Sequence, residues 1–246
     1  MNGPESHRPD AALLLLAHGS RDRRSVAATH ALAREVSRVR PALTVRCSFL
    51  DLAQPRTGPV LTRLAAAGHR EVVVVPLLLT AAYHSRVDVP TVLAAATPPG
   101  LAVYPTGVLG PDSRLVDGLT RRLGPGDGFD ALVLAAAGSS DPGALSTVGG
   151  TAAALGERYA LPCQAGYASA EPGVDTAVRQ LRKSGARRVA VASYFLAPGL
   201  LYDRVVRSAR QAGALAVAEP LVAIPELVRV VSDRFTAASQ GISLPV

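Results

Sequence analysis

The chain has 246 residues, enough for one large α/β domain or for two smaller domains with buried cores. It carries 26 lysine and arginine residues against 19 aspartate and glutamate residues, a formal net charge of +7, and Lys183 is its only lysine. The arginines are spread along the chain without a dense basic run, and only 4% of the residues are aromatic. Nucleic acid is therefore a poorer partner than a polycarboxylate or phosphate ligand.

The cysteines and the N-terminus exclude several other classes of protein. Cys47 and Cys163 lie far apart and outside any CxxC or Cys/His cluster, so neither a disulfide framework nor a structural zinc site is expected. Residues 1–10 carry Glu5 and Asp10 and are expected to form a disordered tail, not a signal peptide. No apolar run approaches the roughly 20 residues that cross a bilayer. We expect a soluble, cytoplasmic protein without a membrane partner.

The first half of the chain alternates β-rich runs with segments of helical periodicity. The expected strands are 12–17, 44–49, 71–79 and 101–104, and the expected helices are 23–39, 59–67, 87–96 and 112–123. Strands that alternate with helices predict a mainly parallel sheet with right-handed crossovers.

After a turn-rich linker at 124–128 the same order begins again. The expected strands are 131–136, 163–167, 187–196 and 215–217, and the expected helices are 144–159, 174–184, 200–212 and 225–236. A repeat period of roughly 120 residues is typical of duplicated domains. The sequence thus predicts an α/β protein of two tandem flavodoxin-like domains, 11–124 and 129–246. Each would be a mainly parallel sheet flanked by helices. A pseudo-twofold axis would relate them, and the second half would close one side of the crevice between them.

Comparison of the two halves identifies polar residues that the fold does not require. When the two halves are aligned, three of them correspond to apolar residues of the second half: His18 to Ala137, Asp51 to Ala168, and His84 to Leu201. Each follows the carboxyl end of an expected strand, so all three should gather at one rim of the sheet. A single histidine there more often makes one structural hydrogen bond, but three such residues that vanish together favour a functional site. They could bind a divalent metal ion or accept protons, and both roles stay open.

Further basic residues lie near these positions or elsewhere on the chain. Arginines that follow the three polar residues and could border the same crevice are Arg21, Arg23, Arg24, Arg56 and Arg86. Guanidinium groups suit carboxylates and phosphates, although each of these arginines could equally lie on a solvated helix face. The remaining histidines are expected to be structural or solvated: His7, His30 and His69.

Three ordered segments of the first half carry a resemblance to a known family. They are Leu-Ala-His-Gly-Ser-Arg at 16–21, Ser-Phe-Leu-Asp-Leu-Ala-Gln-Pro at 48–55, and Val-Pro-Leu-Leu-Leu-Thr-Ala-Ala-Tyr-His-Ser-Arg-Val-Asp-Val-Pro at 75–90. In these segments the chain resembles the sirohydrochlorin chelatases of siroheme and cobalamin biosynthesis, class II tetrapyrrole chelatases of the CbiX/SirB type. The resemblance is dense in the first half, whereas the second half matches mainly as scaffold.

The resemblance implies roles for individual residues. His18 and His84 match the histidines that bind the metal or accept protons in the family. Asp51 stands where the family usually has glutamate, and Gln54 stands where relatives often have another acid. The residues expected to contact the substrate are Ser20, Arg21, Tyr83, Ser85 and Arg86.

The expected reaction is insertion of a divalent metal, with Fe²⁺ favoured over Co²⁺, into sirohydrochlorin, an anionic tetrapyrrole that loses both pyrrolic protons. The metal would be a substrate, and no permanent cofactor is expected. No GxxxxGK[ST] loop is present, so no nucleotide is expected either. The chain would be a monomer with an internal pseudo-dimer, or a homo-oligomer.

Other functions compete with this interpretation. A cobaltochelatase of cobalamin synthesis would use the same residues, and a non-catalytic tetrapyrrole or metal carrier would use the same crevice without turnover. A histidine phosphatase resembles the His18 segment, but such enzymes have an arginine where this chain has Ala17. A duplicated receiver-like domain would need a cluster of acids after the first strand, and the sequence has none there.

Overall fold

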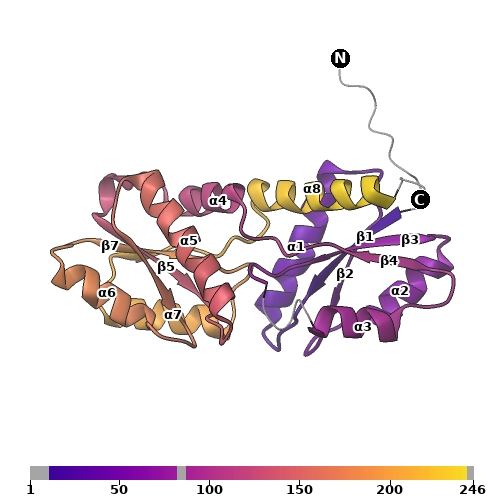
Figure 1. The fold of residues 1–246 in the computed structure, drawn as a ribbon, viewed down its shortest axis with the longest axis horizontal. Helices are drawn as coiled ribbons and strands as arrows, with labels where there is room; N and C mark the ends of the chain where they lie inside the picture. Colours follow the sequence, from indigo (N-terminus) through magenta and orange to yellow (C-terminus); the bar gives the residue numbers. More distant parts are fainter. Residues whose placement is uncertain (1–10, 82–86, 243–246) are drawn as a thin grey trace, which may run out of the picture.

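The computed structural model describes residues 11–81 and 87–242, which form two lobes, each built around one β-sheet (Figure 1). The predicted tail at 1–10 lies outside the described residues, as do positions 82–86. Both sheets have four parallel strands, in the orders β2-β1-β3-β4 and β6-β5-β7-β8. The predicted fold class, two tandem α/β units with parallel sheets, is confirmed.

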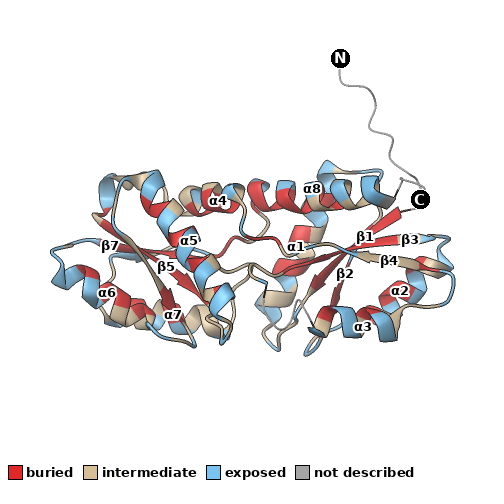
Figure 2. Cartoon of the chain, in the orientation of Figure 1, coloured by how far each residue is buried: buried red, intermediate tan, exposed pale blue. Residues whose placement is uncertain are grey.

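The strands lie close to the predicted positions. Those of the first sheet are β1 (Ala11–Ala17), β2 (Val45–Phe49), β3 (Glu71–Pro76) and β4 (Ala102–Pro105). Those of the second are β5 (Ala131–Ala136), β6 (Cys163–Tyr167), β7 (Val189–Ser193) and β8 (Ala216–Val217). The central strands are continuous apolar runs because helices cover both of their faces, as parallel sheets require (Figure 2).

The helices follow the predicted order as well. They are α1 (Arg23–Val39), α2 (Thr57–Ala66), α3 (Val89–Ala96), α4 (Ser113–Leu123), α5 (Pro142–Tyr159), α6 (Val174–Lys183), α7 (Leu200–Gln211) and α8 (Pro225–Ile242). The linker contains a short 3₁₀ turn, η2 (Gly126–Gly128). Aspartate side chains at 22, 112 and 141 accept backbone hydrogen bonds and cap the helices that follow them. Strand β3 ends before the predicted 79, because the chain leaves the sheet there to form a cavity wall.

The last helix of each half packs on the other half. Helix α4 contacts β7 and α5 of the second lobe, whereas the C-terminal α8 contacts β3 and α1 of the first. In Figure 1, α4 and α8 lie end to end along one side of the molecule, each above the lobe of the other half. The domain ranges 11–124 and 129–246 remain a prediction. Along the chain α4 belongs to the first range and α8 to the second, but each packs on the lobe formed by the other range.

The exchange gives the molecule one continuous core. The faces of both sheets under α1, α4, α5 and α8 belong to a single cluster of buried side chains that includes Leu13 of β1, Leu115 of α4, Leu132 of β5 and Val231 of α8. The opposite faces are separate clusters, one under α2 and α3 and the other under α6 and α7. Among the described residues, no helix is long and apolar enough to cross a membrane.

Candidate active site

His18 directly follows β1, and the turn after it depends on a glycine. Gly19 has φ +97°, and a Cβ at this position would lie 1.7 Å from the backbone oxygen of Asp51. Because only glycine tolerates both the positive φ and this close approach, the turn brings the loop after β2 against the loop after β1. The Asp51 N–H donates to the His18 carbonyl at 2.9 Å. The imidazole itself is exposed.

Asp51 lies beside His18 and is held by an arginine. Its carboxylate accepts from the Arg56 guanidinium at 2.8 Å, and a second nitrogen of Arg56 donates to the Leu50 carbonyl at 2.7 Å. The backbone N–H of Leu52, then Arg56 and to a lesser extent the charge of His18, hold the pKa of Asp51 below its usual value. Asp51 is therefore an ionised hydrogen-bond acceptor at neutral pH, and it lies close enough to His18 for an electrostatic interaction with a protonated imidazole.

The structure corrects one pairing between the halves. Ser169, not Ala168, occupies the place of Asp51, because its N–H donates to the Ala137 carbonyl as that of Asp51 donates to His18. The loop spans 49–55 in the first half and 167–172 in the second, so an alignment on the following proline is shifted by one residue. The second half thus has a neutral hydroxyl where the first half has a carboxylate, and this hydroxyl donates to the Ala137 carbonyl at 2.7 Å.

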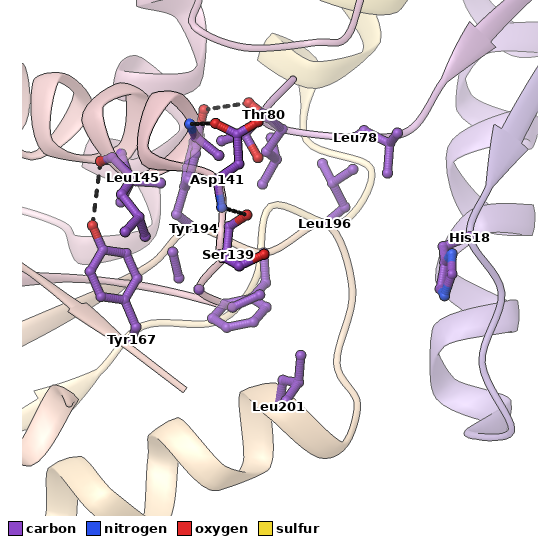
Figure 3. A pocket seen from close by; sticks show the side chains of 18 of the residues that line it. His18, Leu78, Thr80, Ser139, Asp141, Leu145, Tyr167, Tyr194, Leu196 and Leu201 are labelled. Carbon is purple, nitrogen blue, oxygen red and sulfur yellow. Dashed lines mark hydrogen bonds between the residues drawn. The ribbon is translucent and has the colours of Figure 1, made fainter. Parts of the chain in front are cut away.

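A cavity of about 950 Å³ opens between the two lobes, and His18 lies on its wall (Figure 3). The segments that follow β1 and β3 line one side of it, and those that follow β5 and β7 line the other. The carboxyl ends of the two sheets therefore face each other, and the carboxyl-terminal edge is where open α/β sheets bind ligands. The volume is at the upper end of the range typical of small-molecule sites, roughly 300–1,000 Å³.

The second half supplies most of the remaining wall, as expected for two halves that pack about a pseudo-twofold axis with the crevice between them, although the sequence comparison did not name the side chains. Its contributions are the turn at 136–142 and the side chains of Tyr167, Tyr194, Phe195, Leu196 and Leu201. Figure 3 shows Ser139, Leu196 and Leu201 across the open space from His18. Burial raises the pKa of Tyr194 to about 12, so its phenol stays neutral. The signal available in the sequence was the duplication itself, since a pseudo-twofold axis turns equivalent rims toward each other.

The predicted substrate contacts Ser20 and Arg21 lie in the turn between β1 and α1. Ser20 Oγ accepts from the Asp22 N–H at 3.0 Å, so it shapes the turn before α1, and Arg21 is exposed next to it. Neither residue, nor Asp51, belongs to the cavity wall. Arg24 spans the lobes instead, with ion pairs of 2.6 Å to both Asp22 and Asp203 of α7.

Four predicted residues lie outside the described part of the chain: Tyr83, His84, Ser85 and Arg86. Thr80 and Val87, which lie before and after this part of the chain, both line the cavity. Within the described ranges, no group of three or more histidine, cysteine, aspartate or glutamate side chains could hold a metal ion. Of the three polar residues singled out in the sequence, the structure describes His18 and Asp51.

Comparisons with known proteins agree with this architecture. The sequence profile of the CbiX family matches residues 12–125 and again residues 131–238. The chain belongs to the CbiX family. The two matches correspond to the two sheets of this CbiX-family protein and confirm the resemblance found in its three sequence segments.

Individual relatives of this CbiX-family chain are more distant. It is 27% identical over 183 residues to the sirohydrochlorin cobaltochelatase of Priestia megaterium, and the match covers 69% of this chain and 59% of that relative. It is 26% identical over 209 residues to the sirohydrochlorin ferrochelatase of Bacillus subtilis (strain 168), with 81% and 79% of the chains covered. The solved structure of SirB from Bacillus subtilis with Fe³⁺ shares the fold, with a TM-score of 0.82, 22% identity, and coverage of 95% and 98%.

Proposed function

We propose that this protein is a sirohydrochlorin chelatase that inserts a divalent metal ion, Fe²⁺ or Co²⁺, into the tetrapyrrole. The observation that carries the proposal is the position of His18, at the end of β1 and on the wall of a cavity of about 950 Å³ between the lobes. A cavity of this size, with aromatic and aliphatic side chains on the far wall, suits the face of a planar macrocycle. Family membership and the names of the relatives support the same reaction.

The reaction needs a group that passes the metal to the macrocycle and a base for the pyrrolic protons. In the proposal His18 meets the metal or accepts a proton from the first-half side of the cavity, since imidazole titrates near neutral pH. Asp51, ionised and adjacent, stabilises the cationic imidazole by its charge. His84 is the proposed second imidazole, and the segment that carries it begins and ends at residues of the cavity wall. The metal enters as substrate and leaves within the product, so no resident cofactor is required.

Substrate carboxylates are the proposed partners of basic groups around the cavity. Arg21 lies exposed directly after the His18 turn, and the chain as a whole has a net charge of +7. Guanidinium groups pair with carboxylates through two hydrogen bonds, which would orient the macrocycle. Tyr83, Ser85 and Arg86 are proposed to contact the same substrate.

The choice of metal is the finer part of the proposal, and we favour Fe²⁺. Imidazole and carboxylate ligands bind both Fe²⁺ and Co²⁺, so the ligand set alone discriminates weakly. The two relatives carry different names, one a cobaltochelatase and the other a ferrochelatase. Cobalt insertion is therefore the second candidate activity.

The test is anaerobic metal insertion, followed by the absorption spectrum of the tetrapyrrole, with each metal and with substrate in excess over protein. We expect multiple turnovers, faster with Fe²⁺, and a loss of at least about 100-fold in His18→Ala and in His84→Ala. Because His18 is exposed, His18→Ala should keep the unfolding temperature of the parent. A single stoichiometric binding event would identify a carrier, and unchanged rates in both variants would refute the proposal.

A further inference from the structure

A second cavity, of about 630 Å³, lies over strand β2 at the edge of the first sheet. Its walls come from α1 on one side and from α2 with the turn after it on the other, so we call it the α1–α2 groove. It shares no lining residue with the cavity that contains His18. Ligands at the two sites would therefore not compete for the same side chains.

The α1–α2 groove is lined by positive groups without compensating acids. Arg34 of α1, Arg46 of β2 and Arg63 of α2 are all exposed along it, and no aspartate or glutamate is among the lining residues. None of these arginines forms an ion pair within the part of the chain that the structure describes. Elsewhere on this chain exposed arginines commonly pair with carboxylates, as Arg38 does with Glu35 at 2.9 Å.

Besides the arginines, the groove is lined by one thiol, two imidazoles, two hydroxyl side chains and several apolar side chains. Cys47 Sγ lies 3.2 Å from His30 Nδ1, and Val45 and Leu64 are among the apolar lining residues. Burial raises the pKa of Cys47, so the thiol is neutral and leaves the positive charge uncompensated. A metal cation would be repelled by the three guanidinium groups, whereas an anion with an apolar body would be attracted.

The second half contains the same three elements without the charges. Equivalent positions follow from matching helix caps, strand register and backbone hydrogen bonds. The pairs are His30 and Gly149, Arg34 and Ala153, Arg46 and Gln164, Cys47 and Ala165, Arg63 and Gln180, and His69 and Ala186. Because the fold forms without any of these groups in the second half, their presence together around one groove calls for a function.

We propose that the α1–α2 groove binds a small polyvalent oxyanion, the chemistry shared by phosphate esters and polycarboxylates. Arg34, Arg46 and Arg63 come from three different elements and each offers the planar fork that such oxygens accept. Val45, Val60 and Leu64 contact the apolar part of the ligand. The site is separate from metal insertion and does not depend on the proposed function.

Calorimetric titration of the full chain with pyrophosphate and with citrate tests the proposal and separates the two sources of oxyanion. The test variant replaces each arginine by the residue of the second half: Arg34→Ala, Arg46→Gln and Arg63→Gln together. The control removes the same charge from exposed positions on α6 and α7: Lys183→Gln, Arg207→Gln and Arg210→Gln. We expect binding of at least one probe that the test variant weakens roughly 10-fold or more, while the control changes it less than about twofold.

Several results would overturn the proposal. The first is that neither pyrophosphate nor citrate binds at about 1 mM. The second is equal weakening of binding in the test and control variants, and the third is displacement of the bound probe by sirohydrochlorin. Circular dichroism checks that the test variant folds, and Arg34→Ala alone replaces it if it does not. Metal insertion is measured on the same samples, and the test variant should retain it, so failure at the groove is distinguishable from failure at the cavity.

Discussion

Gly19 is the residue on which the geometry of the candidate active site depends most directly. Gly138 occupies the equivalent turn of the second half. Its φ is +94°, and a Cβ added there would lie 3.0 Å from the nearest atoms of Ala170. We expect Gly138→Ala to cost roughly 1–2 kcal/mol for its positive φ. Gly19→Ala should cost clearly more, because its Cβ would overlap the Asp51 carbonyl, and it should also slow metal insertion. Denaturant unfolding and insertion rates of the two variants measure this, and equal losses would contradict it.

The charge of Asp51 gives a prediction for pH dependence. Because the pKa of Asp51 is held below its usual value, the carboxylate stays ionised down to about pH 4. Any loss of metal insertion between pH 7 and pH 5 must therefore come from another group, such as an imidazole. In Asp51→Asn we expect a lower rate and an acid limb that persists but moves to lower pH, because loss of the neighbouring negative charge disfavours the cationic imidazole. Disappearance of the acid limb in this variant would show that Asp51 titrates in that range.

At the level of single residues, the sequence predicted the position of His18 after β1 but not the counterpart of Asp51 in the second half. A histidine directly after a buried strand has its position fixed by the strand, so pattern alone placed it at the rim. Asp51 lies in an irregular loop whose length differs between the halves, and its true counterpart, Ser169, emerged only from hydrogen bonds. The groove histidines were expected to be structural or solvated, because His30 lies mid-helix and His69 follows Gly68 at the end of a helix. No sequence pattern joined either of them to Arg46.

At the level of elements, one ion pair with a buried carboxylate joins the exchanged helices α4 and α8. Glu226, at the start of α8, is 4% exposed and accepts two hydrogen bonds from Arg121 Nε and one from Nη2 at 2.7–3.1 Å. Arg121 and, more weakly, Arg229 lower the pKa of Glu226. A carboxyl whose pKa is lower in the folded state stabilises the fold above its unfolded pKa and loses that effect as the pH falls.

We expect Glu226→Gln to destabilise the protein by roughly 1–2 kcal/mol at pH 7, a value reduced from that of a fully buried pair because Arg121 is more than half exposed. The difference from the parent should shrink below about pH 4.5. Denaturant unfolding at several pH values measures it. The exposed pair of Arg38 with Glu35 supplies the control, since Glu35→Gln should change little. A pH-independent difference would argue against the ion pair as the cause.

The strands and helices themselves followed from the sequence with small shifts at their ends. Continuous apolar runs and period-3.6 segments are local signals, and capping aspartates such as Asp22 mark where helices begin. The packing partner of α4 was not predicted, because an amphipathic helix fits any apolar face that the connecting loop can reach.

For the whole molecule, the shared core predicts that the halves do not fold alone. A fragment of residues 1–124 would lack α8, leaving the face of β3 that α8 covers exposed, while its own α4 would have no sheet to cover. We expect this fragment to associate, with α4 of one copy on the sheet of another, or to aggregate. Light scattering after size-exclusion chromatography measures its mass, and a stable monomer with cooperative unfolding would contradict the prediction.

The sequence by itself determined the two parallel sheets, their order along the chain, the family, and the location of His18 at the end of a strand. These depend on local periodicity and on motifs of consecutive residues. Only the tertiary structure decided that α4 and α8 exchange lobes, which side chains of the second half form the wall opposite His18, and that three arginines line the α1–α2 groove. Such contacts join residues far apart in the chain, and their energy depends on distances that no local pattern encodes.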